Sequence, residues 1–209
     1  MVFLDFSLLS KYGIPFSPSK VATSLQQVQE VAREIGFPLA MKAISKQALH
    51  KSDVGGVLLD ISSPSELESA YSLLQRRFSG MQLEGVLIQK MASKSKSTVE
   101  LIIGGKRDAQ FGQLIMLGMG GIFVEVYKDV SFRVCPISKE DALEMIHELR
   151  AFPILMGARG RKPVNINALA STLVKVSVLL ESENPSEFDI NPILADEKGC
   201  IAVDVRMLP

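Results

Sequence analysis

One stretch of the sequence, MKAISKQALHKSDVGGV, gathers residue types that suit phosphate chemistry. Lys42 lies inside an apolar run at 37–44 that is typical of a buried strand, and His50 lies in the polar loop that follows. Gly55 and Gly56 close this loop. Glycines let a backbone approach a phosphate closely, lysine supplies a point charge, and neutral imidazole is a nucleophile near pH 7. A solvated lysine, a loop histidine without a function and an ordinary Gly-Gly turn are the alternative explanations.

A second candidate site lies in the last two predicted strands, which flank the turn at 196–199. With glycine as its last residue, this turn sets a register that places Asn191 directly opposite Asp204. Opposed side chains have Cβ atoms roughly 4.5–5.5 Å apart, so an amide oxygen and a carboxylate there suit one Mg²⁺ ion. An ordinary polar cross-strand pair is the alternative. Asp189 would oppose Arg206 and form an ion pair.

The composition is that of an ordinary globular protein of 209 residues. It is 47% apolar and 22% charged, with 23 basic and 23 acidic residues. The balanced charge and the lack of a basic tail argue against nucleic acid or a membrane surface as a partner. Two cysteines favour a reducing compartment, and neither a signal peptide nor an apolar run of about 18 residues is seen. We therefore predict a cytoplasmic location.

The order of predicted elements indicates an α+β fold in two lobes. The first lobe, about 1–91, reads as helix, strand, loop, strand, helix and strand. The second, about 92–209, has short strands with glycine turns, two helices and a final hairpin. His147 falls late in the first of those helices, where it suits the helix dipole, so we interpret it as structural.

With these residues in hand, the chain resembles the ATP-grasp (β) subunit of ADP-forming acyl-CoA synthetases, such as ADP-forming acetate–CoA ligase. The similarity runs in order along nearly the whole chain, through YGIPFSPSKVATS…EIGFPLAMKAIS, LHKSDVGGV, ELIIGGKRDAQFGQLIMLGMGGIFVEVYKDVSFRVCPI and EFDINPIL…AVDVR. More distant similarity to the β subunit of succinyl-CoA synthetase supports Asn191 and Asp204 as a magnesium pair. The resemblance implies one ATP-grasp domain whose two lobes hold the nucleotide between them.

The resemblance also implies a reaction, acyl-CoA + ADP + phosphate ⇌ carboxylate + ATP + CoA. His50 matches a histidine that passes phosphate between a partner subunit and the nucleotide. The positions implied for ATP or ADP are Lys42, Gly55, Gly56, the hinge strand Gln89, Lys90 and Met91, then Glu100, Gly120, Gly121, Glu125 and Arg133. A salt bridge with Lys128 or Arg133 is the alternative for Glu125.

The chain lacks a fingerprint for CoA binding, so the resemblance implies a CoA-binding α subunit with the acyl site and a hetero-oligomer. Two other functions stay open. A different ATP-grasp carboxylate ligase would form the acyl phosphate directly and would not need His50. A non-catalytic module that senses adenine nucleotide would not need the metal pair. The residues do not decide the acyl group, ADP against GDP, or the stoichiometry.

Overall fold

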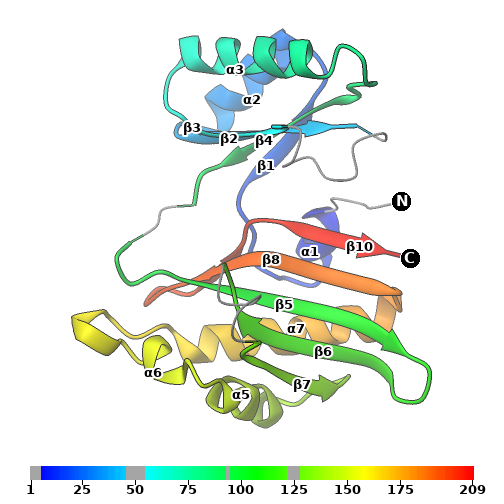
Figure 1. Cartoon of the computed structure of the whole chain (residues 1–209), viewed down its shortest axis with the longest axis vertical. Coiled ribbons are helices and arrows are strands. Elements are labelled where there is room, and N and C mark those ends of the chain that lie inside the picture. The colour runs from blue at the N-terminus through cyan, green and yellow to red at the C-terminus, as the bar shows by residue number, and fades with distance from the viewer. Residues whose placement is uncertain (1–5, 46–54, 93–94, 122–127) are drawn as a thin grey trace. The chain divides into compact units, whose positions relative to one another are not determined.

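A computed structural model describes residues 6–45, 55–92, 95–121 and 128–209 (Figure 1). The chain divides into two compact units. Unit 2 is Ser17–Met91, and unit 1 joins Met1–Phe16 to Ala92–Pro209. The sequence assigned the N-terminal residues to the first lobe, whereas the structure groups them with the second half of the chain. Contacts of these residues within unit 1 include a bridge between Phe16 and Ala202 and an ion pair between Lys11 and Glu183.

Unit 2 is a four-stranded antiparallel sheet with two helices. The strand order is β1-β4-β2-β3. In chain order the elements are β1 (Ser19–Ala22), α2 (Leu25–Ile35), β2 (Leu39–Ile44), β3 (Val57–Ile61), α3 (Pro64–Arg77) and β4 (Gly85–Lys90). Ser24 and Ser63 cap the two helices, because each side chain accepts a hydrogen bond from a backbone N–H of the first turn.

The core of unit 2 lies between its helices and one face of this sheet. Alternate strand residues, such as Met41 and Ile88, pack there against Val28, Leu74 and Phe78. Successive strand side chains point to opposite faces, so Lys42 projects from the face that the helices do not cover.

Unit 1 is built on a sheet of six strands. The order is β10-β8-β5-β6-β7, and β9 also pairs with β8. The strands are β5 (Val99–Asp108), β6 (Gly112–Met119), β7 (Val130–Val134), β8 (Glu187–Ala195), β9 (Cys200–Ala202) and β10 (Val205–Leu208). The helical elements are α1 (Phe6–Lys11), α5 (Lys139–Glu148), α6 (Phe152–Leu155), a 3₁₀ turn (Ala158–Gly160) and α7 (Ile166–Glu183).

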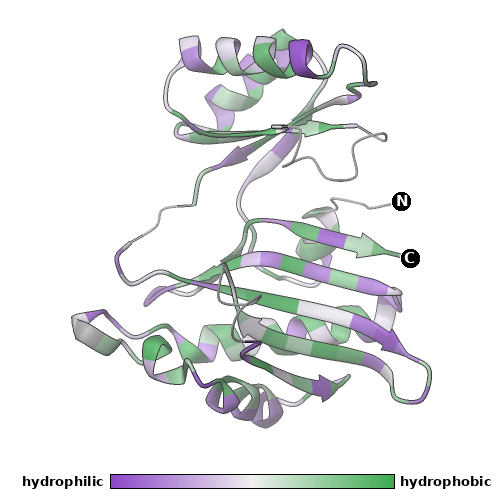
Figure 2. Ribbon diagram, viewed as in Figure 1, coloured by the Kyte–Doolittle hydropathy of each residue, from purple (hydrophilic) through white to green (hydrophobic). Residues whose placement is uncertain are grey.

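Helices α5 and α7 lie along one face of the six-stranded sheet (Figure 1). Hydrophobic residues run along β6 and much of β5 (Figure 2). Leu101, Ile103, Ile115 and Leu117 are buried there, together with Leu173, Val176 and Leu180 of α7. Ser138 and Asp141 form the predicted cap of α5, each accepting from the other's backbone N–H. Within the described residues, no helix combines the length and the apolar character that a membrane span needs.

Candidate functional site

Lys42 occupies the centre of β2, with Val57 of β3 and Leu87 of β4 as its neighbours in the sheet. Only 8% of its surface is exposed. Next to it, the N–H of Ala43 donates to the carbonyl of Gly56 at 2.8 Å. Lys42 therefore lies on a strand, as predicted, and the second glycine of the Gly-Gly pair is hydrogen-bonded to the residue next to it.

Gly55 adopts a left-handed backbone conformation, with φ of 65°. Its carbonyl accepts a 2.6 Å hydrogen bond from Nη1 of Arg77, at the end of α3. A Cβ at Gly55 would lie 2.7 Å from that nitrogen. Arg77 could not be predicted from the sequence, because a contact over 22 positions leaves no mark in local spacing. His50 lies outside the described residues, so its role stays a prediction.

The predicted hinge strand, Gln89 to Met91, is held tightly within unit 2. Gln89 is buried. The N–H of Lys90 donates to Pro18 and the N–H of Met91 donates to Pro38, at 2.8 and 3.1 Å. The ammonium of Lys90 donates to the carbonyls of Gly36, at 3.0 Å, and Phe37, so it stabilises the end of α2. That this strand holds a nucleotide base stays a prediction.

In unit 1, Glu100 and the Gly120-Gly121 pair come together. The N–H of Gly120 donates to the carbonyl of Glu100 at 2.7 Å. A Cβ on Gly120 would lie 2.9 Å from that carbonyl group, and one on Gly121 would lie 3.7 Å from the Glu100 carboxylate. The glycine turn thus runs directly over the acidic residue. Glu125 lies outside the described residues.

Asn191 and Asp204 lie opposite each other in the hairpin register that the turn predicted. Their neighbours pair as Ile190 with Val205 and Ile193 with Ala202. The N–H of Asn191 donates to the carbonyl of Asp204 at 3.2 Å. Strand β8 also shifts its register against β5 at this point, so the local backbone departs from a regular ladder.

Two further charged residues, Asp189 and Arg206, lie beside this pair. Asp189 lies opposite Arg206 as expected, but Arg206 forms its ion pair with Asp204, with 3.8 Å between Nε and Oδ2. The prediction of an Asp189–Arg206 ion pair is therefore wrong. Burial raises the pKa of Asp189 to about 6, with Arg206 opposing and Asp204 adding to this shift. An amide oxygen and carboxylates are hard donors, so this set fits Mg²⁺.

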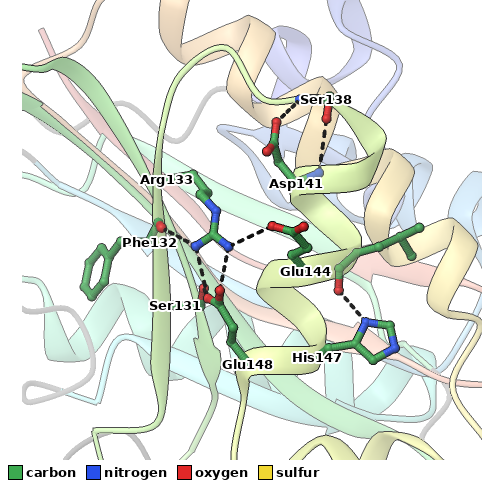
Figure 3. Close-up of polar contacts among 9 residues, drawn as sticks. Ser131, Phe132, Arg133, Ser138, Asp141, Glu144, His147 and Glu148 are labelled. Carbon is green, nitrogen blue, oxygen red and sulfur yellow. Dashed lines mark hydrogen bonds and ion pairs between the residues drawn. The ribbon is translucent and has the colours of Figure 1, made fainter.

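Arg133 points toward α5 (Figure 3). Its guanidinium contacts Glu148 at 2.6 and 3.0 Å and Glu144 at 3.4 Å. Hydrogen bonding to Glu148 raises the pKa of Arg133. Arg133 and Ser131 in turn lower the pKa of Glu148 to about 2. Since two carboxylates already engage this guanidinium, we do not propose Arg133 as a phosphate ligand.

His147 agrees with its structural interpretation. Its Nδ1 lies 2.6 Å from the carbonyl of Leu143, one turn earlier in α5. Its ring packs against Phe152, with centroids 4.4 Å apart. Both contacts are internal to unit 1, so neither requires a ligand.

The sequence matches the ATP-grasp domain over residues 5–208, so the chain is an ATP-grasp protein. Within that class the chain belongs to the family of β subunits of ADP-forming acetate–CoA ligases. It is an enzyme subunit of the acid–thiol ligase type.

Similar sequences and solved structures cover nearly the whole chain. It is 49% identical to subunit beta of acetate–CoA ligase [ADP-forming] I from Pyrococcus furiosus, over 96% of this chain and 88% of that one. It is 44% identical to acetate–CoA ligase [ADP-forming] I from Archaeoglobus fulgidus, of which it spans 30%. The structure of ACD1 from Ca. Korarchaeum cryptofilum in complex with coenzyme A superposes with a TM-score of 0.90 at 42% identity. That match covers 97% of this chain and 89% of the ACD1 chain.

Proposed function

We propose that this chain is the nucleotide-binding subunit of an ADP-forming acyl-CoA synthetase and passes phosphate between His50 and ADP. The net reaction is acyl-CoA + ADP + phosphate ⇌ carboxylate + ATP + CoA. The main support is the Ca. Korarchaeum cryptofilum synthetase, 41% identical, whose phosphohistidine segment points towards its nucleotide binding site in a complex with Mg-AMPPCP. The sequence LHKSDVGG supplies this chain's histidine.

The described residues support this role in each unit separately. In unit 2, Lys42 is held rigidly in the sheet and can supply a fixed positive charge to nucleotide phosphates. Beside it, hydrogen bonds to the carbonyls of Gly55 and Gly56 hold this backbone in place. The backbone is therefore oriented before the nucleotide binds. In unit 1, Glu100 and Gly121 are the further groups that we assign to the nucleotide.

Asn191 and Asp204 are the residues that would hold Mg²⁺. When bound, this ion would neutralise phosphate charge during transfer. The protein's own contribution is to hold an amide oxygen and a carboxylate on opposed strands, with Asp189 beside them. The Arg206 guanidinium lies 3.8 Å from the Asp204 carboxylate, so it would compete with the ion for this donor.

The acyl and CoA chemistry is assigned to a partner, a CoA-binding α subunit. The support is the Pyrococcus furiosus relative, which is named as a subunit and of which this chain covers 88%. We therefore propose a hetero-oligomer.

The test is transfer of label from [γ-³²P]ATP with Mg²⁺ to the purified chain, with and without the partner subunit. We expect acid-labile, alkali-stable label that is lost in His50→Asn. His147→Asn is the matched control, because the chain has two histidines and His147 is held within α5. No label in wild type, with nucleotide binding intact, would overturn the proposal. Full synthetase activity in His50→Ala would favour a ligase that forms the acyl phosphate directly.

A further inference from the structure

The connection between α5 and α7, residues 150–163, is held to unit 1 at several points. The carboxylate of Asp129 accepts hydrogen bonds from the N–H groups of Arg150 and Ala151, at 2.8 and 2.9 Å. Leu155 is fully buried, and its carbonyl accepts from Val164 at 2.8 Å. These contacts give both ends of the connection a fixed place.

The turn within this connection has a fixed shape as well. Gly157 has φ of 89°, and a Cβ there would lie 2.4 Å from the carbonyl oxygen of Arg161. The N–H of Gly157 donates to Ile154 at 3.1 Å, and the N–H of Lys162 donates to the Ser97 hydroxyl at 2.9 Å. Since the backbone is ordered in advance, binding through this segment would lose little conformational entropy.

The outer surface of this connection combines apolar and basic side chains. Ile154 is 37% exposed and Met156 is 52% exposed. Arg150, Arg161 and Lys162 are also exposed. Figure 1 shows the segment extending past the start of α7 in unit 1. We call residues 150–163 the basic connection.

The charge of the basic connection is one-sided. The sequence has no acidic residue between Glu148 and Glu181, while the whole chain has as many acidic as basic residues. Lys162 forms an ion pair with Glu197 at 3.2 Å, and its side chain is still 71% exposed. Such a surface favours an acidic partner and repels a second copy of itself.

We propose that the basic connection is a docking surface for an acidic, partly apolar face of the partner subunit. This rests on the proposed function, which requires such a subunit. Exposed Met and Ile beside Arg fit a protein interface better than a free phosphate, because an inorganic anion makes no use of apolar area. A symmetric contact between two copies would bring like charges together.

The test measures association of the full chain with its co-expressed CoA-binding subunit, at low and high salt. We expect Arg161→Glu/Lys162→Glu to raise the Kd at least tenfold, with most of the effect at low salt. Ile154→Ser/Met156→Ser should also raise it, without the salt dependence. The matched controls are Lys106→Glu/Arg107→Glu, a second adjacent basic pair that is exposed, and Val178→Ser, which is 44% exposed. Both should stay near wild type.

Hydrogen exchange on the unmodified complex gives a second measurement, in which amides of the basic connection should gain protection. A complex that the segment variants do not weaken, and in which these amides gain no protection, would overturn the docking surface alone. Tight binding of inorganic phosphate, or a homodimer that both pairs of substitutions abolish, would also overturn it. If wild type forms no complex with a CoA-binding subunit, the proposed hetero-oligomer fails together with this inference. Labelling of His50 from ATP separates these cases, since it tests the nucleotide reaction without the interface.

Discussion

Arg77 donates a 2.6 Å hydrogen bond from Nη1 to the carbonyl oxygen of Gly55, across 22 positions of the chain. The left-handed φ of Gly55, 65°, turns that carbonyl toward α3. One bond therefore ties the end of α3 to the start of β3. It fixes the backbone at the place where the segment that contains His50 returns to the sheet.

Gly55→Ala should destabilise the protein by about 1–2 kcal/mol, because an alanine there is strained in the left-handed region. Its Cβ would also lie 2.7 Å from Arg77 Nη1 and displace the guanidinium. Urea unfolding measures the change. Gly80→Ala is the control, since nothing lies within 4 Å of a Cβ there and its φ is outside the left-handed region. Equal stability of the two variants would show that the Gly55 conformation is unimportant.

Because of the Arg133–Glu148 pair, the free energy of unfolding should decrease as the pH falls from about 4 toward 2. The folded pKa of Glu148 is lowered to about 2, against about 4.3 in an unfolded chain. Its stabilisation is therefore fully present above pH 4.3 or so and is lost as the pH falls toward 2. The Glu148 side chain is 49% exposed, so we expect solvent to limit the coupling to about 0.5–1 kcal/mol.

A double-mutant cycle with Arg133→Met and Glu148→Gln measures this coupling directly. The coupling should be present at pH 7 and reduced at pH 3. A coupling that is zero at pH 7, or that grows as the pH falls, would contradict the pairing. High salt should weaken it at pH 7, since both side chains are partly exposed.

Asn191→Ala and Asp204→Ala should each weaken metal-dependent nucleotide binding at least tenfold. They remove one of the oxygen donors from the opposed pair while the hairpin, which is held by backbone bonds, stays formed. Manganese binding in the presence of ADP, followed by electron paramagnetic resonance, is a direct measurement. Arg206→Gln should act in the opposite direction and tighten metal binding, because it removes a cation 3.8 Å from the Asp204 carboxylate. The same manganese affinity in all three variants would exclude this pair as the metal site.

The sequence was sufficient for contacts that depend on local spacing. The register of Asn191 and Asp204 followed from one four-residue turn, because side-chain alternation leaves little freedom once a turn is placed. The Ser138–Asp141 cap and the strand position of Lys42 were local in the same sense. In each case the residues that decide the structure lie within a few positions of one another.

Contacts between distant segments were not predictable in this way. Arg133 has the same residue type and neighbourhood whether it faces a ligand or α5, and only the packing of that helix on the sheet decides. Arg206 lies opposite Asp189, yet its ion pair is with Asp204, a choice made by side-chain rotamers. Arg77 reaches Gly55 because α3 ends beside β3, which no spacing rule expresses.

Gly120→Ala should destabilise the protein more than Gly112→Ala, because the added Cβ at Gly120 would meet backbone atoms. A Cβ on Gly120 would lie 2.9 Å from the carbonyl carbon and oxygen of Glu100. It would therefore break the 2.7 Å hydrogen bond from the N–H of Gly120 to that carbonyl. We expect a loss of about 2–3 kcal/mol, against about 1 kcal/mol for Gly112→Ala, which has left-handed φ but open space. Since this shift also displaces Glu100 and Gly121, nucleotide affinity should fall in Gly120→Ala and stay unchanged in Gly112→Ala. Calorimetric titration with ADP compares the two, and wild-type affinity in Gly120→Ala would separate the glycine turn from nucleotide binding.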